Sequence, residues 1–557
     1  MFYKIHIDDR NYLDWKWYND KDMKETDINK NQIEFKLFTG DIVDINGNLK
    51  ESIIRDASYI PGILLSSKKT YGRNSKDKFY YKCLPNDKRL PAFLIAYNEK
   101  QILFDKKLKD NYVLFKFQKW DDKHPIGSLT QTIGDINELV NFYEYQLYCK
   151  NLYVSLKKFT NNTMDMVNKK QDESFIKTIT DKYKNIEDRS SSYNVFTIDP
   201  NSKGDLDDAM SIDEEKMSVY IANVPLLLDY YNLWESFSKR ISTIYLPDRK
   251  RPMLPSILSE QLCSLLENES RIAFCMDIYI KDYKIIDIKF SNVIIKVKKN
   301  YVYDELSLLE NKDYKKIKET VSIMCREYKY IKSVSDSHDV VAFLMILMNY
   351  ESAKIMLKYK TGIYRNLKMK EMITPSSNVP DEILNFVKIW QCSCGSYNIY
   401  NENNSHELIG GESKAYIHIT SPIRRLVDLL NIVKIQEIFN YITVNDNLKQ
   451  FYDNWINNLE YINTSMRAIR RVQIDCSILD MCTKNTKMLE TEYQGYLFDK
   501  VIRDNKFNQY TVYLPEFKII SRINLKEDVN DYSHKRFKIY LINDEATLKK
   551  KIRLQCI

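Results

Sequence analysis

Four aspartates stand close together in residues 195–210, whose sequence is VFTIDPNSKGDLDDAM. They are Asp199, Asp205, Asp207 and Asp208. Carboxylates at this density repel one another unless a cation lies among them. Their hard oxygen atoms favour magnesium or manganese, which also bind phosphate groups. Two such ions can activate a water molecule and hold the leaving oxygen of a phosphodiester, so the segment predicts metal-dependent phosphodiester chemistry.

Two other interpretations of the aspartate segment compete with a magnesium site. A solvated acidic loop is the ordinary explanation of any aspartate cluster. A calcium-binding EF-hand loop that starts at Asp199 would place Lys203 at its fifth position and Met210 at its twelfth. Lysine cannot serve as the fifth ligand and methionine cannot replace the bidentate glutamate, so these two positions exclude the EF-hand.

A strand and a loop must position the four carboxylates. Residues 195–198 are β-branched and aromatic, which predicts a buried strand. Pro200 and Gly204 interrupt regular structure directly after it. The loop is therefore expected to bring the three later aspartates back beside the first.

A second segment, residues 416–428, reads YIHITSPIRRLVD and predicts the start of a helix. Ser421 is a favourable N-cap, and Pro422 suits the first helical position. Arg424 would then lie in the first turn, where free N–H groups and the helix dipole attract anions. A guanidinium group there can hold a phosphate through two hydrogen bonds. The alternative is a surface ion pair between Arg424 and Asp428, and the residues alone support both interpretations equally.

Length and composition indicate a folded protein of several domains. The chain has 557 residues, which corresponds to roughly three or four domains. Hydrophobic residues make up 44% and charged residues 29%, which is ordinary for a globular chain. The formal net charge of +8 favours a polyanionic partner only weakly at this size. The 10 cysteines are scattered, so we expect reduced thiols in a reducing compartment.

The chain is expected to be cytoplasmic and not bound to a membrane. Its first ten residues are acidic and polar, unlike a secretory signal. No apolar run approaches the roughly 20 residues that span a bilayer. The longest apolar run, residues 342–348, is predicted to be part of a core helix.

The segment TIDPNSKGDLDDA resembles the catalytic signature of the ribonuclease II (RNB) family of 3′-to-5′ exoribonucleases. The sequences YLPDR and PMLP, within residues 244–255, and TSPIRR, at residues 420–425, stand at the spacing of that family. The resemblance extends over nearly the whole chain and is strongest at residues 195–275 and 416–428.

The resemblance implies a multidomain α+β protein, in which OB-type, cold-shock-like β-barrels flank a mixed α/β RNB catalytic domain. The first barrel is expected at residues 1–92, and the second barrel with a linker at 93–185. The catalytic domain is expected at 186–488 and a C-terminal OB-fold RNA-binding domain at 489–557. Short alternating strands in the first and last of these segments agree with small barrels.

The implied activity is processive hydrolysis of single-stranded RNA from the 3′ end to nucleoside 5′-monophosphates, by a monomer with Mg²⁺ or Mn²⁺. The implied metal ligands are Asp199, Asp205, Asp207 and Asp208. Asp207 and Asp208 would also act directly in catalysis. Arg424 would neutralise the scissile phosphate, and Arg425 would contribute to RNA binding.

The resemblance also assigns three residues to the RNA strand. Tyr245 matches a tyrosine that stacks on a base near the 3′ end, a contact that every base permits. Tyr303 matches a tyrosine beside a ribose, where a hydrogen bond to the 2′-hydroxyl would select RNA over DNA. Gln473 matches a residue that supports the cleaved phosphate.

Three positions depart from the family pattern. Tyr220 stands where histidine is usual, Asn223 where aspartate is usual, and residues 342–344 are apolar where acidic residues usually precede Met345. These departures support a second hypothesis, an RNA-binding homologue with weak or no catalytic activity. The missing acidic residues before Met345 alone support a third, cleavage of DNA as well as RNA. Retention of the four aspartates and Arg424 favours the enzyme.

Overall fold

The computed structural model describes residues 2–557 except 27–35, 99–108, 172–173, 184, 201–203, 329–330, 332, 368–378, 393–394, 403, 407–414, 505–506 and 545–549. Residues 201–203 of the aspartate segment therefore lie outside the description. The chain forms two compact units. The first unit comprises Met1–Tyr153, Leu246–Asp248 and Arg471–Ile557. The second comprises Val154–Tyr245 and Arg249–Arg470.

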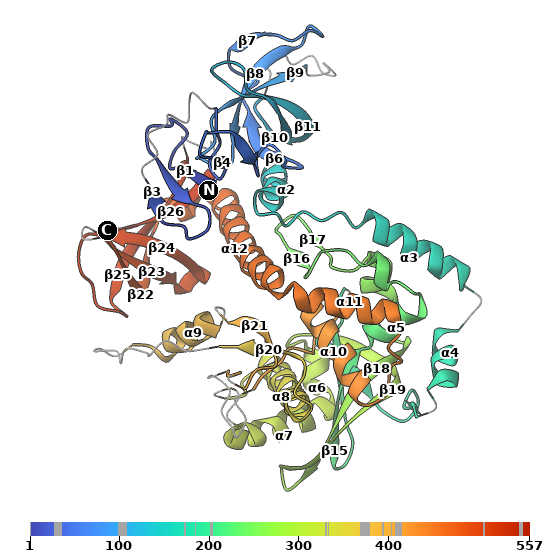
Figure 1. Ribbon diagram of the computed structural model, residues 1–557. Coiled ribbons are helices and arrows are strands. Elements are labelled where there is room, and N and C mark those ends of the chain that lie inside the picture. Colours follow the sequence, from blue (N-terminus) through green and yellow to red (C-terminus); the bar gives the residue numbers. More distant parts are fainter. Residues whose placement is uncertain are drawn as a thin grey trace, which may run out of the picture. The chain divides into compact units, whose positions relative to one another are not determined.

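Three β-sheets build the first unit (Figure 1). The first sheet has the order β3-β2-β1-β4-β5 and contains β1 (Phe2–Ile7), β2 (Trp15–Asn19), β3 (Glu25–Thr26), β4 (Ile42–Asp44) and β5 (Leu49–Glu51). The last has the order β24-β23-β22-β25-β26 and contains β22 (Glu492–Asp504), β23 (Phe507–Leu514), β24 (Ile519–Leu525), β25 (His534–Asn543) and β26 (Lys550–Cys556).

The middle sheet of the first unit closes into a small barrel. Its order is β6-β10-β11-β9-β8-β7, and β6 also pairs with β8. Its strands are β6 (Ile60–Leu64), β7 (Thr70–Arg73), β8 (Phe79–Pro85), β9 (Phe93–Tyr97), β10 (Asn111–Lys119) and β11 (Ile126–Asp135). A Cβ atom at Gly62 would lie 2.8 Å from Cys83 Sγ, so glycine permits the close approach of β6 and β8.

The domain boundary expected at residue 92 falls inside this barrel. β8 and β9 lie on either side of that position and pair from Phe79–Tyr97 to Cys83–Phe93. Strands on both sides also share one core, which includes the buried rings of Phe93 and Phe115. The helix α2 (Leu139–Cys149) follows the barrel. The structure thus joins residues 60–135 in one sheet, because hydrogen bonds and apolar contacts cross the expected boundary.

The second unit is built around a six-stranded mixed sheet of order β12-β19-β13-β14-β15-β18 (Figure 1). Its strands are β12 (Glu187–Asp188), β13 (Val195–Asp199), β14 (Asp208–Ile212), β15 (Lys216–Ala222), β18 (Ser270–Lys281) and β19 (Lys284–Val302). The long strand β19 pairs with β18 through its first part and with β13 through its last residues. The pairing that runs from β19 through β13, β14, β15 and β18 therefore returns to β19. This closed arrangement fixes the end of β13 and the start of β14.

The second unit also contains helices. They are α3 (Lys157–Lys169), α4 (Phe175–Lys182), α5 (Val224–Tyr230), α6 (Leu306–Glu310), α7 (Lys312–Tyr328), α8 (Ser337–Lys358), α9 (Asp381–Cys392), α10 (Leu426–Ile438) and α11 (Asp446–Asn457). Among them, α6, α7, α8 and α10 share the core of the sheet. A further helix, α12 (Leu459–Lys484), contains residues of both units. The core includes sheet side chains such as Phe196 and Met210 and helix side chains such as Leu344 and Leu347.

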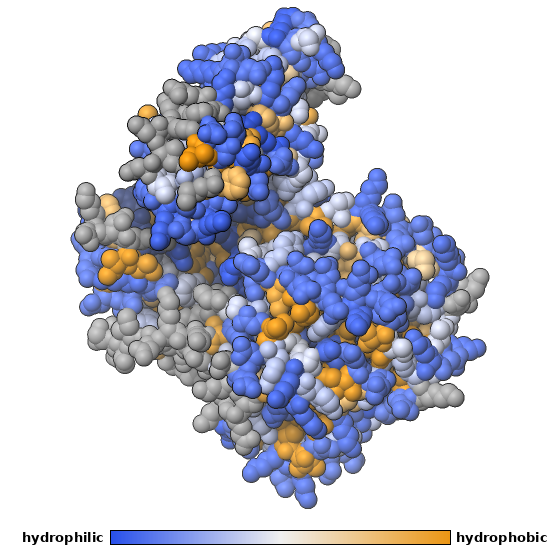
Figure 2. All heavy atoms as spheres, viewed as in Figure 1, coloured by the Kyte–Doolittle hydropathy of each residue, from blue (hydrophilic) through white to orange (hydrophobic). Residues whose placement is uncertain are grey.

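The apolar run at residues 342–348 lies in α8. Among the described residues, α8 is the helix with the length and hydropathy to cross a bilayer, yet 61% of its most apolar window is buried in the protein. Phe343, Leu344, Leu347 and Met348 belong to the main core cluster. Burial against other elements of the unit explains the apolar composition of the helix. The face drawn in Figure 2 is mainly hydrophilic, with smaller apolar patches.

Candidate active site

The strand that precedes the aspartates and the strand that follows them are neighbours. β13 ends at Asp199 and β14 begins at Asp208, and the two strands run antiparallel. Ser264 fixes the loop that joins them: its Oγ donates to the carbonyl oxygen of Gly204 at 2.7 Å and accepts from the N–H of Leu206 at 3.2 Å. The predicted strand and returning loop are therefore present.

Asp199 and Asp208 each present a carboxylate oxygen that no hydrogen bond satisfies. In both residues Oδ2 is buried and has no partner among the described residues. Burial and the charge of Asp208 raise the pKa of Asp199 to about 8, and burial raises the pKa of Asp208 to about 6. Burial therefore disfavours the charged form of both carboxylates, and the charge of Asp208 adds to this cost at Asp199. A cation bound at these oxygens would instead stabilise the charged forms of the two carboxylates.

Asp207 instead holds an arginine. Its Oδ1 accepts the backbone N–H of Ile423 at 2.8 Å, and its Oδ2 accepts from Arg424 Nε at 3.0 Å. The side chain of Asp207 is 1% exposed. Burial raises its pKa to about 7, while the guanidinium of Arg424 favours the charged form. The third aspartate of the loop therefore links the two predicted motifs directly.

Asp205 is paired with a lysine that the sequence analysis did not select. Lys250 Nζ lies 3.0 Å from Asp205 Oδ1 and 2.8 Å from Glu260 Oε1. The side chain of Asp205 is 4% exposed. Lys250 belongs to the short strand β17 (Lys250–Arg251). It lies in the same proline-rich segment as Tyr245. The feature of the sequence that could have indicated Lys250 is its position among the basic residues of YLPDRKRPMLP.

The helix predicted to start at Pro422 starts at Leu426, and its N-cap is Arg425 rather than Ser421. Residues 421–424 form a turn. Arg425 is extended and bridges to Ser242, while the N–H of Leu426 donates to the carbonyl oxygen of Ile241 at 2.9 Å. The predicted cap is displaced because these backbone groups pair with the segment at residues 241–243 instead.

The alternative ion pair between Arg424 and Asp428 is not formed. Asp428 Oδ1 accepts from the N–H of Ser421 at 2.8 Å and from Arg425 Nη2 at 2.8 Å. Arg424 turns to Asp207 instead. Arg425 therefore pairs with Asp428, whose carboxylate also accepts a hydrogen bond from the turn at Ser421. The side chain of Arg425 is 27% exposed.

Arg424 is fixed by its backbone but keeps an accessible guanidinium group. Its carbonyl oxygen accepts from the N–H of Thr243 and from Ser242 Oγ, both at 2.9 Å. Its Nη2 donates to Ser421 Oγ at 3.0 Å. The side chain is 45% exposed. Such a group can bind an external phosphate without leaving Asp207.

Tyr303 lies beside the two carboxylates with free oxygens. Its N–H donates to the carbonyl oxygen of Asp199 at 3.2 Å. Burial, with the charges of Asp208 and Asp199, raises the pKa of Tyr303 above its ordinary value. Its ring stacks on His338, with 3.6 Å between ring centroids and 12° between planes. His338, at the start of α8, is exposed and was not selected from the sequence.

Tyr245 lies within range of the charge of Arg424. It ends the short strand β16 (Ile244–Tyr245), which pairs with β17, and it is 43% exposed. Burial raises the pKa of Tyr245 and the charge of Arg424 opposes that change. An exposed ring near a guanidinium group can stack on a planar ligand.

Gln473 is not brought to these residues by any contact that the structure describes. It lies on α12 within the first unit, whereas the aspartates and Arg424 belong to the second. Its support of the cleaved phosphate stays a prediction.

The donor set fits a divalent cation at Asp199 and Asp208 only. Both offer buried, unpartnered carboxylate oxygens, which hard cations prefer. Asp205 and Asp207 already accept from Lys250 and from Arg424. In the part of the chain that the structure describes, no group of three histidine, cysteine, aspartate or glutamate side chains is arranged to hold a metal ion. Metal binding by all four aspartates therefore stays a prediction.

Two parts of the chain match known family models. Residues 187–340 match the family model described as the RNB domain, and residues 80–143 match the Dis3-like cold-shock domain 2 (CSD2). The predicted resemblance to the ribonuclease II (RNB) family is thereby confirmed, as is the mixed α+β fold class with an OB-type barrel.

Known proteins resemble the chain in part or throughout. DIS3-like exonuclease 2 of Schizosaccharomyces pombe is 31% identical over 239 residues, which cover 39% of this chain and 25% of that protein. The match thus spans a quarter of the length of that relative. Mycoplasma genitalium RNase R in complex with ribose-methylated single-stranded RNA has a TM-score of 0.68 at 15% identity, with 100% of both chains covered. Yeast Ssd1, described as a pseudonuclease, has a TM-score of 0.57 at 13% identity, with 97% of this chain and 80% of that chain covered. The two structures show a shared fold.

We expect Lys250→Met to destabilise the second unit by about 1–3 kcal/mol, because it leaves the carboxylate of Asp205 buried without its cationic partner. Urea denaturation at pH 7 with EDTA measures the change. Lys299→Met is the matched control: Lys299 is 49% exposed and lies 3.7 Å from Glu267, so its loss should cost under about 0.5 kcal/mol. Equal effects of the two substitutions would show that solvent screens the Asp205 pair.

We expect Asp199→Asn to stabilise the metal-free protein, and increasingly so as the pH rises. The carboxyl group has a pKa of about 8 in the folded chain and near 3.8 when unfolded, so the native state loses stability as pH rises through this interval. Urea denaturation with EDTA at pH 4.5 and pH 8 should show the larger gain at pH 8. Asp453→Asn, on the exposed face of α11, is the control. A gain independent of pH would contradict the assigned burial cost.

Proposed function

We propose that this protein is a hydrolytic exoribonuclease that degrades single-stranded RNA from its 3′ end to nucleoside 5′-monophosphates, with Mg²⁺ or Mn²⁺. The observation that carries the proposal is the link between the two motifs. Asp207 holds Arg424 beside the unpartnered oxygens of Asp199 and Asp208. The loop thus offers a place for a cation and, next to it, an accessible guanidinium group for a phosphate.

A bound divalent cation would supply an activated water molecule at Asp199 and Asp208. The chain's own residues would then orient the substrate. Arg424, directed by Asp207, would bind the scissile phosphate and offset the negative charge that builds on it in the transition state. The exposed ring of Tyr245 would stack on a base near the 3′ end. Tyr303 would contact the sugar beside the carboxylates.

The comparisons support this function through the RNB domain. One relative is named as an exonuclease, and the RNase R structure contains single-stranded RNA. The matched segment includes the aspartates and Tyr245 and Tyr303, since it covers residues 187–340. Single-stranded RNA is accordingly the substrate we propose for this chain, acting as a monomer in the cytoplasm.

A second candidate is an RNA-binding protein without nuclease activity. The observation in its favour is that Asp205 and Asp207 are already paired with Lys250 and Arg424, so two of the four predicted metal ligands are occupied. The similarity in fold to a pseudonuclease shows that this architecture does not require catalysis. A time course on 5′-labelled single-stranded RNA, with magnesium or EDTA, separates the two. Magnesium-dependent loss of RNA establishes the enzyme, and binding without cleavage establishes the second candidate.

We expect Asp208→Asn to abolish turnover while RNA binding stays near that of the wild type. The substitution removes an unpartnered carboxylate oxygen that would bind the cation, and it leaves Arg424 and Tyr245 in place. Denaturing gels measure cleavage and fluorescence anisotropy measures binding. Cleavage at the wild-type rate would remove Asp208 from the catalytic assignment.

We expect Arg424→Ala to lower the turnover rate by roughly 10²–10³, as does the loss of one charge-stabilising donor in other enzymes. Single-turnover cleavage with saturating protein measures the rate. Arg326→Ala, on the exposed side of α7, is the control and should leave the rate unchanged. An unchanged rate in Arg424→Ala would restrict this residue to orienting the aspartate loop.

A further inference from the structure

The start of α8 is bonded to the residue that follows Tyr303. Ser337, the first residue of α8, donates from its N–H to Asp304 Oδ1 at 3.0 Å and from its Oγ to the same oxygen at 2.8 Å. In return, the N–H of Asp304 donates to Ser337 Oγ at 3.0 Å. Ser337 is 0% exposed, so water does not compete for its side of this junction. The two segments are therefore held together here, although they are 33 positions apart in the chain.

This junction places two neighbouring rings, those of Tyr303 and His338, against each other. Their centroids are 3.6 Å apart and their planes differ by 12°, which is van der Waals contact. The imidazole thus covers one face of the phenol ring, and a base cannot stack on that face. Asp336 fixes the end of the helix that carries His338, because its side chain accepts from the N–H of Asp339 at 3.0 Å. Both rings are therefore attached to anchored backbone.

The hydroxyl group of Tyr303 remains available to a ligand. It makes no hydrogen bond with any residue in the described part of the chain, and its oxygen atom is not buried. Burial of the ring raises the pKa of Tyr303, and the charges of Asp208 and Asp199 add to this rise. The hydroxyl therefore lies within electrostatic range of both carboxylates. A phenol hydroxyl can donate and accept, which suits a hydrogen bond with a sugar hydroxyl.

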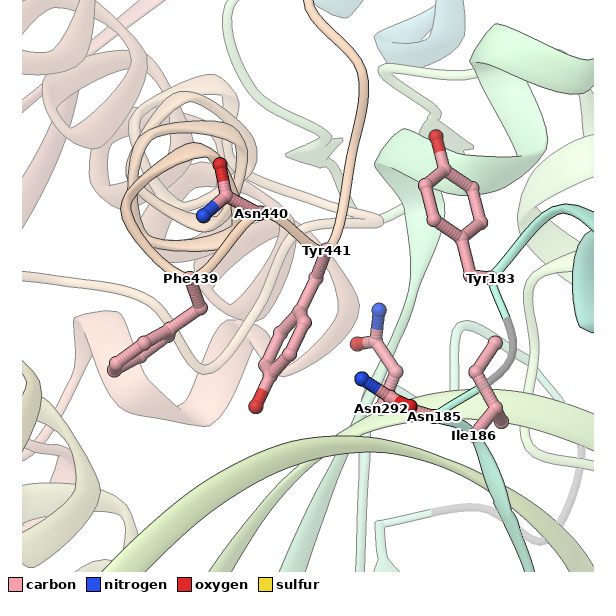
Figure 3. Close-up of a pocket in the computed structure, with 7 residues that line it drawn as sticks. All are labelled: Tyr183, Asn185, Ile186, Asn292, Phe439, Asn440 and Tyr441. Atoms are coloured by element: carbon pink, nitrogen blue, oxygen red, sulfur yellow. The ribbon is translucent and has the colours of Figure 1, made fainter.

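The stacked pair is separate from the pocket drawn in Figure 3. That pocket has a volume of about 400 Å³, and its walls include Tyr183, Asn292 and Tyr441. Neither Tyr303 nor His338 lines it. His338 is instead exposed, beside the half-buried ring of Tyr303. The pocket and the stacked pair are therefore different parts of the second unit.

We propose that His338 is a positioning residue for sugar recognition: its ring, stacked on Tyr303, holds the Tyr303 hydroxyl at the 2′-hydroxyl of a ribose. A ring that is covered on one face has fewer orientations, so less conformational entropy is lost when its hydroxyl binds. Without the imidazole, the phenol would keep its hydroxyl but lose its fixed direction. The role of His338 rests on the proposed contact between Tyr303 and a sugar, but it requires no cleavage. It therefore applies to an exoribonuclease and equally to an inactive RNA-binding protein.

RNA binding in EDTA, where metal-dependent cleavage is blocked, tests this role. Fluorescence anisotropy compares an oligoribonucleotide with otherwise identical strands that each carry a single 2′-deoxy sugar near the 3′ end. In the wild type we expect one such position to weaken binding about fivefold, which is the effect of one lost hydrogen bond. Tyr303→Phe should remove this preference for ribose, since it deletes the hydroxyl group.

We expect His338→Ala to reduce the preference for ribose to less than about twofold, while the affinity for the 2′-deoxy strand changes little. His338 is exposed, so truncating it leaves the core intact. His338→Phe keeps a flat ring at the same place and should restore most of the preference. His534→Ala is the matched control, because His534 is also exposed and lies beside a tyrosine ring, that of Tyr496, in the first unit. It should leave the ratio of the two affinities unchanged.

The ratio of affinities distinguishes a positioning role from a structural one. An equal loss of affinity for the ribose and 2′-deoxy strands in His338→Ala would overturn the proposal. A wild-type ratio in that variant, or a wild-type protein without a preference at any position, would overturn it as well. A parallel time course with magnesium examines the nuclease separately. Absence of cleavage, together with a ribose preference that depends on His338, would reject the nuclease and support the role of His338.

Discussion

The contact on which the site depends is the ion pair between Asp207 and Arg424. The two residues are 217 positions apart, and the bond from Nε to Oδ2 is 3.0 Å long. It joins the loop after β13 to the turn before α10, and the N–H of Ile423 strengthens the junction by donating to the same carboxylate. Because Asp207 is almost fully buried, the guanidinium group compensates a charge that burial would otherwise disfavour. One carboxylate therefore orients the accessible guanidinium group of Arg424.

The electrostatics of the loop divide the four aspartates into two kinds. Asp205 and Asp207 are neutralised within the chain, by Lys250 and Arg424. Asp199 and Asp208 each keep an oxygen that is unpartnered among the described residues; burial and the charge of Asp208 raise the pKa of Asp199, and burial raises the pKa of Asp208 against the opposing charge of Arg424. An external cation is therefore attracted to Asp199 and Asp208 rather than to the two aspartates that are already paired.

The departures from the family pattern have structural explanations. Tyr220 is fully buried, and its hydroxyl is bonded to Ser211 Oγ at 2.8 Å across β14 and β15. Asn223 caps α5 and orients the buried amide of Asn292. Neither residue contacts the carboxylates of the aspartate loop through any hydrogen bond that the structure describes. These changes bear on the packing of the sheet and on the buried hydrogen bonds of Asn223 more than on the proposed chemistry.

Local sequence predicted the strand before Asp199 and the loop that returns the other aspartates, because β-branched runs and proline or glycine breaks act over a few residues. It also singled out Arg424, whereas Tyr245 and the division into barrels came from the family resemblance, and the expected boundary at residue 92 falls inside one sheet. Only the tertiary structure decided where α10 begins, since the backbone at residues 241–243 takes the hydrogen bonds that a cap at Ser421 would use. It likewise decided which aspartates remain free, because Lys250 and Arg424 approach them from distant segments. Such pairings depend on packing between elements, which residue spacing does not encode.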